Sequence, residues 1–306
     1  MSKLSVYTLC LAMIWGSSFP ISQLGVEQIG AMPFRVLTIL FSTIILIIFT
    51  YNKLKASLAN VSCMDIVKLS LLAIPNIFIV PMINNISLAY MSVSTATLLI
   101  YLMPCFVSLL TMLDEKKVSY ISIAATTLCI SGVLILSKFN SFNISEYLMI
   151  FNAFIWGLGA ILSKKIVISS CSMSIRVTIQ MIATLTLTLL VTSIWWAIDG
   201  SIFDKFRLNY LLDYTTIISI LYIGGVGSAL VYYLWFKLID LNSAEFTSYA
   251  TLLSPIISIA IAVTIFDEIL DNYMIVGGVL IFSSSCIVLL RPLVCKLLNQ
   301  VRSIVT

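Results

Sequence analysis

Four residues with polar, aromatic or very small side chains recur along one apolar segment, residues 146–166. Their spacing of i, i+4, i+7 and i+11 places them on one helix face: Asn152, Trp156, Gly159 and Ser163. An amide, an indole and a hydroxyl on one face favour the wall of a partly hydrated cavity that binds an organic molecule. The alternative is helix packing, because Gly and Ser allow close approach of a neighbouring helix.

The first apolar segment, residues 4–24, carries an equivalent stripe of Trp15, Ser18 and Ser22. Other apolar segments contain isolated asparagines and tyrosines, which either line the same cavity or serve as packing residues. We predict the following substrate-binding residues: Trp15, Ser18, Asn76, Asn84, Tyr101, Asn152, Trp156, Tyr232 and Tyr249.

Three charged residues in or beside the apolar segments are candidates for gating or coupling. Arg35 and Arg176 occupy equivalent positions near the starts of two segments, and either pair with carbonyls or carboxylates in alternating gates or anchor the segment ends by snorkelling. Glu245 is the best candidate for ion coupling, because no carboxylate lies in the middle of an apolar segment. Uniport or exchange fits the sequence equally well.

The residue inventory argues against catalysis and metal binding. The chain has no histidine, and its seven cysteines form no CxxC pair. With no paired mid-segment carboxylates either, we predict no catalytic residue, no metal site, no cofactor and no enzymatic activity.

Composition predicts an integral membrane protein. Of the 306 residues, 60% are hydrophobic and only 10% are charged, whereas soluble domains carry about 25% charged residues. The net charge of +4 comes from basic residues scattered over short loops, so we expect a lipid bilayer and no nucleic acid as partner.

Ten apolar runs are long enough to cross a bilayer as helices. Their approximate limits are 4–24, 34–52, 66–88, 92–113, 118–137, 146–166, 174–197, 214–238, 243–266 and 272–290. With a cytoplasmic N-terminus, 13 of the Lys and Arg residues fall on the inner side and 4 on the outer side. The positive-inside rule therefore predicts that both termini are cytoplasmic.

The two halves of the chain repeat each other. Ile-Trp-Gly at 14–16 recurs at 155–157, Arg35 matches Arg176 at the same offset of 141, and "YLMPCFVSLL" at 101–110 resembles "LLSPIISIAI" at 252–261 at an offset of 151. Five segments per repeat is an odd number, so the repeats should have opposite orientations in the membrane. Inverted repeats are typical of secondary transporters. The predicted fold is therefore all-α, with ten transmembrane helices as two inverted five-helix repeats around a central cavity.

On these motifs, "IWGSSFP", the Arg after Met32-Pro33 and "LAYMSVSTATLLIYLMPCFVSLLTMLDEK" at 88–116, the chain resembles the drug/metabolite transporter superfamily and its EamA-like branch. The resemblance implies one repeat at 1–140, a second at 146–292 and a short cytoplasmic tail at 293–306. It also implies a cavity lined mainly by spans one, three, four, six, eight and nine, and a location in the inner (plasma) membrane.

We expect a secondary-active transporter of small metabolites that works by alternating access. Export or exchange of amino acids or related amphipathic compounds is the leading interpretation, and its small-molecule substrate is a partner together with the bilayer. The alternatives are import or antiport of a cofactor-like or nucleotide-like metabolite and, more distantly, a non-transporting membrane subunit. Either a monomer or a homodimer fits the sequence.

Overall fold

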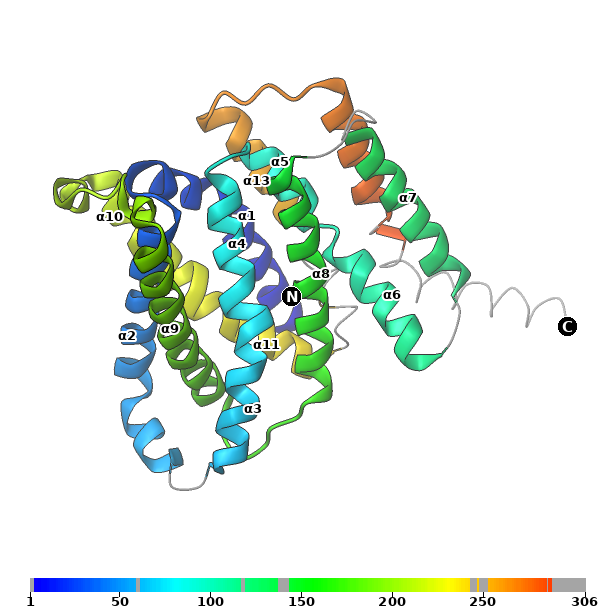
Figure 1. The fold of residues 1–306 in the computed structure, drawn as a ribbon. Helices are drawn as coiled ribbons and strands as arrows, with labels where there is room; N and C mark the ends of the chain where they lie inside the picture. The colour runs from blue at the N-terminus through cyan, green and yellow to red at the C-terminus, as the bar shows by residue number, and fades with distance from the viewer. Residues whose placement is uncertain are drawn as a thin grey trace, which may run out of the picture.

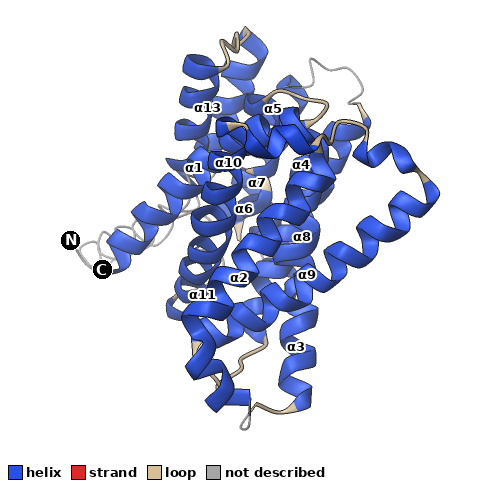
Figure 2. Cartoon of the chain, turned by 90° about the vertical axis from the view of Figure 1, so that its left-hand side faces the viewer, coloured by secondary structure: helices blue, strands red, loops and turns tan. Residues whose placement is uncertain are grey.

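The computed structural model describes residues 3–58, 61–116, 119–136, 143–242, 247, 253–284 and 286–287. Every regular element in these ranges is helical (Figures 1 and 2). The α-helices are α1 (Lys3–Ile29), α2 (Ala31–Leu58), α3 (Cys63–Ala73), α4 (Val80–Leu88), α5 (Val93–Ile100), α6 (Met103–Glu115), α7 (Tyr120–Leu136), α8 (Ile144–Lys165), α9 (Met173–Ile198), α10 (Tyr214–Leu221), α11 (Val231–Leu241) and α13 (Leu253–Ile265). A further apolar helix covers Asn272–Ser284.

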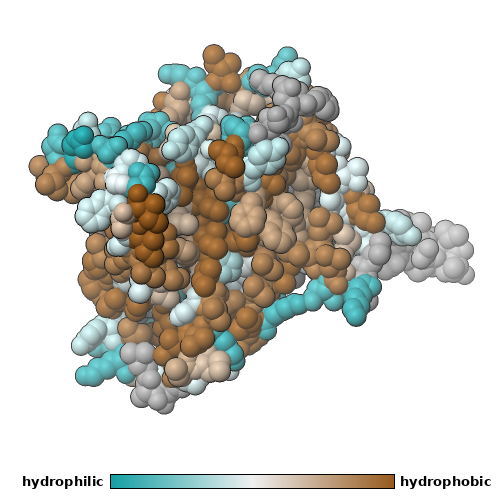
Figure 3. All heavy atoms as spheres, viewed as in Figure 1, coloured by the Kyte–Doolittle hydropathy of each residue, from teal (hydrophilic) through white to brown (hydrophobic). Residues whose placement is uncertain are grey.

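The ten predicted segments each have a helical counterpart. Seven helical stretches of the described chain are long and apolar enough to cross a membrane, and the remaining three are shorter apolar helices. The face seen in Figure 3 is mostly hydrophobic over its middle, with hydrophilic side chains gathered towards the two ends of the bundle. The chain is therefore a multi-pass membrane protein, as its composition predicts.

Spans three and eight are continuous helices with a π-helical turn in the middle. In span three, η1 (Ile74–Ile79) joins α3 to α4; in span eight, η4 (Tyr222–Leu230) joins α10 to α11. The repeat offset of 151 places residues 74–79 on 225–230, inside η4. Pro75 lies inside η1 and Pro81 follows it, whereas a glycine-rich run forms η4, so different local chemistry produces the same departure from α-helical geometry.

The loop between α9 and α10, the longest predicted linker, contains two short 3₁₀ helices. These are η2 (Gly200–Phe203) and η3 (Leu208–Leu212). The Asp199 side chain caps η2 by accepting from the Ser201 N–H at 3.0 Å. The repeat offset grows from 141 before this loop to 151 after it, so the second half is about ten residues longer. These extra residues form ordered structure at one end of the bundle (Figure 1).

The two halves pack through reciprocal helix pairs. Helix α1 packs on α13, and its repeat counterpart α8 packs on α6, the counterpart of α13. In the first pair, a Cβ added at Gly16 would lie 2.9 Å from the Ser254 carbonyl oxygen; in the second, a Cβ at Gly157 would lie 3.4 Å from the Met103 carbonyl oxygen. Ser254 and Met103 are themselves related by the offset of 151. The repeated Ile-Trp-Gly thus places a glycine at equivalent close contacts with the opposite half.

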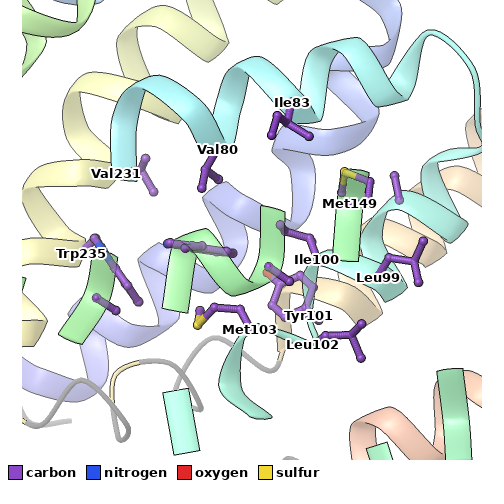
Figure 4. Close-up of a cluster of buried hydrophobic side chains, with 14 of the residues drawn as sticks. Val80, Ile83, Leu99, Ile100, Tyr101, Leu102, Met103, Met149, Val231 and Trp235 are labelled. Atoms are coloured by element: carbon purple, nitrogen blue, oxygen red, sulfur yellow. The ribbon is translucent and has the colours of Figure 1, made fainter. Parts of the chain in front are cut away.

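The largest hydrophobic cluster lies where these helices meet, in the interior of the bundle. Figure 4 shows residues from α4, α8 and α11 and from the break between α5 and α6 converging there. This break falls at Tyr101 and Leu102, just before Pro104, which cannot donate a helical hydrogen bond. It turns the buried Tyr101 side chain towards the centre of the bundle.

Candidate functional site

Three tryptophans meet at the centre of the bundle. The repeat-related Trp15 and Trp156 pack edge to face with ring centroids 4.9 Å apart, and Trp235 lies 5.0 Å from Trp15 and 5.7 Å from Trp156. Trp15 and Trp156 lie near the middle of α1 and α8, so the cluster is at mid-bundle depth. Such aromatic contacts join the two halves and form one wall of the space beside them.

A cavity of about 70 Å³ lies against this cluster. Helices from both halves contribute to it, and its wall combines aromatic, aliphatic and polar side chains. The lining residues are Trp15, Ser18, Phe19, Ser22, Arg35, Thr38, Val80, Pro81, Asn84, Asn85, Leu88, Tyr101, Trp156, Ile223, Gly227, Ser228 and Tyr232. A concave site with a few converging polar groups is typical of small-molecule binding.

Six of the nine residues predicted to bind substrate line this cavity: Trp15, Ser18, Asn84, Tyr101, Trp156 and Tyr232. Arg35, predicted for gating, lines it as well, so span two contributes to the wall in addition to the spans implied by the family resemblance. Two other predictions, Tyr249 and Glu245, lie outside the described residues.

Asn152 is buried and serves to join span six to span three. Its Nδ2 donates to the Val80 carbonyl at 3.0 Å and to Oδ1 of Asn84 at 2.8 Å. Asn152 does not itself line the cavity, but by engaging Oδ1 of Asn84 it orients the amide group of a residue that does. It is therefore a positioning residue in this structure.

Asn76 has a comparable packing role further along the same pair of helices. Its Nδ2 lies 3.2 Å from the Gly159 carbonyl and 3.2 Å from Oγ of Ser163. A Cβ at Gly159 would lie 2.7 Å from Oδ1 of Asn76, so only glycine permits this approach. The polar stripe of span six is thus mainly a packing seam against span three, and Trp156 is its one member at the cavity.

Pro81 explains two hydrogen bonds in the cavity wall. Its nitrogen carries no hydrogen. The Ile77 carbonyl, four residues earlier, therefore has no N–H to accept from in an α-helical pattern, and the Asn76 carbonyl, five residues earlier, has none in a π-helical pattern. These carbonyls accept from side chains instead: the Arg35 guanidinium Nη2 donates to the Ile77 carbonyl, and the Tyr232 hydroxyl donates to the Asn76 carbonyl at 3.0 Å. Span three is thereby tied to spans two and eight.

Of the two alternatives for Arg35, snorkelling from a span end is wrong, and a role in gating stays a prediction. Its side chain is only 2% exposed, and its Nε has no partner among the described residues. Because its helix begins at Ala31, Arg35 is already in the second turn, and its guanidinium turns inward to the freed carbonyl of span three. Burial of a charge in a membrane helix is costly and is typical of functional positions.

Arg176, the repeat counterpart of Arg35, lies in a different environment. Its Nη1 is 3.1 Å from Oδ2 of Asp240, and both side chains are partly exposed. Nearby, Lys164 Nζ donates to the Ile239 carbonyl at 2.9 Å, and Lys165 pairs with Asp114. These contacts link α6, α8, α9 and α11 at the end of the bundle that holds the C-terminus of α8.

A carboxylate joins the two halves at the opposite end. Glu268, in the loop after α13, accepts from the backbone N–H groups of Val93 and Ser94 at 2.7 and 3.0 Å. It therefore caps the N-terminus of α5, where a negative charge is favoured by the helix dipole. The two ends of the bundle are thus held by different polar contacts, of which Lys165–Asp114 at one end and Glu268–Val93 at the other join the two halves.

Sequence reasoning missed several residues of the wall, including Thr38, Asn85 and Ser228. Asn85 adjoins a predicted residue, and Ser228 follows the glycine-rich run of η4, so both had a local signal. Thr38 lies one turn after Arg35 and had none. No group of three or more His, Cys, Asp or Glu residues that could hold a metal ion occurs within the described part of the chain.

Comparisons with known proteins agree with this architecture. The sequence model of the EamA-like transporter family matches residues 3–138 and again 143–290. An uncharacterized transporter from Archaeoglobus fulgidus is 23% identical over 288 residues, which cover 91% of this chain and 94% of that protein. A protein of known crystal structure aligns with a TM-score of 0.65 at 13% identity, over 94% of this chain and 96% of the other, which supports the fold alone.

Proposed function

Because the chain belongs to the EamA-like transporter family, we propose that this membrane transporter is a secondary exporter or exchanger of amino acids or related amphipathic compounds. In the proposed cycle, the substrate binds in the central cavity and the two inverted halves rock around it. We also propose that the protein resides in the inner membrane with both termini in the cytoplasm.

The observation that carries this proposal is the composition of the cavity wall. Aromatic rings from both halves, Trp15 and Trp156, adjoin polar side chains such as Ser22 and Asn84 within one small space. Rings offer stacking surface to an apolar or aromatic group, whereas hydroxyls and amides orient a polar one. An amphipathic metabolite matches both parts of the wall.

The polar contacts at the two ends of the bundle support alternating access. At one end, Lys165–Asp114 connects the two halves beside the Arg176–Asp240 pair of α9 and α11, and at the other end Glu268 connects the second half to α5. Surface ion pairs are worth only about 0–1 kcal/mol, so breaking and re-forming them during a transport cycle costs little. Opening one end at a time requires contacts of this modest strength.

Counterflow in proteoliposomes tests the proposal. Vesicles containing the purified protein are preloaded with an unlabelled amino acid, and accumulation of the same labelled compound is measured over a panel of amino acids. We expect accumulation of at least one apolar or aromatic member. Ser22→Phe, which fills the cavity, should abolish it, whereas Ser131→Phe, on α7 and away from the cavity, should not. Equal flux in both variants would contradict transport through this cavity.

A further inference from the structure

The central cavity contains one unusual feature, a buried cation. Among the described residues that line it, Arg35 is the only charged one, and none of the others is acidic. Arg35 as a whole is only 2% exposed, so bulk water cannot solvate its charge as it would that of a surface arginine. Burial of a charge without a counter-ion costs several kcal/mol per ion in proteins, and a carbonyl partner repays only part of that cost.

Arg35 has more N–H donors than the described residues offer it acceptors. A guanidinium carries five N–H donors, and the Ile77 carbonyl takes one through Nη2, while Nε has no partner in the described chain. A planar fork of free N–H groups matches the two oxygens of a carboxylate. A carboxylate in the cavity would supply the acceptors that these N–H groups lack.

Neighbouring side chains extend the same donor surface. Because Oδ1 of Asn84 accepts from Asn152, its Nδ2 is left with no acceptor among the described residues while the side chain lines the cavity. The Ser22 hydroxyl, 8% exposed, lies in the same wall. The tryptophans Trp15 and Trp156 form the apolar side of the space, so the cavity has a cationic, donor-rich part and an aromatic part.

From this arrangement we propose that Arg35 binds the carboxylate of the transported molecule, an organic acid or zwitterion with an apolar or aromatic body. This inference rests on the proposed transport function and narrows its substrate class. With no acidic residue in the described wall, an ammonium group meets only neutral acceptors. The carboxylate, not the amino group, is therefore the feature that the site selects.

Binding to the full-length protein in detergent tests this selection, with tryptophan fluorescence as the readout because Trp15 and Trp156 lie in the wall. The three probes are L-phenylalanine, 3-phenylpropionate and 2-phenylethylamine. We expect both carboxylates to bind at least about tenfold more tightly than the amine, a difference of about 1.4 kcal/mol. Arg35→Gln should remove this preference, and Arg207→Gln, in an exposed loop, should retain it. Equal or weaker binding of the carboxylates by the native protein, or no binding of them, would overturn the proposal.

A second variant separates ligand binding from the structural role of Arg35. Pro81→Ala restores the N–H that the Ile77 carbonyl lacks, so Arg35→Gln in this background no longer leaves that carbonyl without a donor. We expect the double variant to regain thermal stability but not the carboxylate preference. A folded double variant that still prefers the carboxylates would refute the assignment.

The outcomes also distinguish this inference from the proposed function. Carboxylate-selective binding without flux in proteoliposomes would retain the Arg35 site and remove the transport proposal. Flux of the amine that is unchanged by Arg35→Gln would retain transport and remove the carboxylate site.

Discussion

Gly159 provides the sharpest test of how spans three and six pack. A Cβ added at Gly159 would lie 2.7 Å from Oδ1 of Asn76. The Nδ2 of Asn76 lies 3.2 Å from the Gly159 carbonyl and 3.2 Å from Oγ of Ser163. In Gly159→Ala, overpacking costs about 1–3 kcal/mol. Loss of the two interhelical bonds adds about 1 kcal/mol at roughly 0.6 kcal/mol each, and the better helix propensity of alanine returns about 1 kcal/mol. We expect a net loss of about 1–3 kcal/mol in the free energy of unfolding.

Unfolding in mixed micelles with increasing fractions of sodium dodecyl sulfate, followed by tryptophan fluorescence, measures this free energy. Gly225→Ala is the matched control, because its Cβ would lie 3.6 Å from the nearest side-chain atom, an ordinary contact. The control should be neutral or slightly stabilised.

The Asn76→Ala change offers a further check on Gly159→Ala. Removing the amide removes the clash, so the double variant should be less destabilised than the sum of the single variants by about 1 kcal/mol or more. Gly159→Ala as stable as Gly225→Ala, or strict additivity with Asn76→Ala, would refute the close approach described above.

Two further predictions concern the ends of the bundle. Arg176→Gln breaks the pair with Asp240. Because both side chains are partly exposed, we expect this variant to lose at most about 1 kcal/mol of stability. We also expect an altered rate of substrate exchange, which should not change further when Asp240→Asn is added. Flux equal to that of the native protein would remove this pair from the transport cycle. Glu268→Gln weakens the cap on the first two N–H groups of α5 and should lower stability by about 1 kcal/mol, measured by the same detergent titration at neutral pH. Stability unchanged by the substitution would show that the charge of this cap contributes no free energy.

Much of the candidate site was accessible from the sequence because its residues are chemically out of place. A tryptophan, an asparagine or a tyrosine in the middle of an apolar span has few favourable positions other than the interior. Trp15, Asn84, Tyr101 and Tyr232 were found in this way, and all four line the cavity. The signal identifies interior residues, and it cannot separate those that line a space from those that pack against another helix.

Asn76 and Asn152 show this limit. Both are buried amides that we predicted to bind substrate. Each donates instead to a backbone carbonyl of a neighbouring span, Asn76 to Gly159 and Asn152 to Val80. Whether an interior amide meets a cavity or a carbonyl depends on the partner helix opposite to it. That partner is 72 to 83 residues away in the chain and leaves no local trace.

The sequence by itself determined that the chain lies in a membrane, that it has ten helical segments and that its halves repeat, because composition, run length and recurring phrases are local properties. The repeated Ile-Trp-Gly places a glycine at equivalent contacts with the opposite half, although the residues that these glycines meet became known only from the structure. Only the tertiary structure decided which face of each helix packs against the other helices and which faces the lipid. In a bilayer the lipid-facing and the packed faces of a helix are both apolar, so periodicity carries little information about orientation. The inward turn of Arg35 followed from a carbonyl that a proline in another helix had left free.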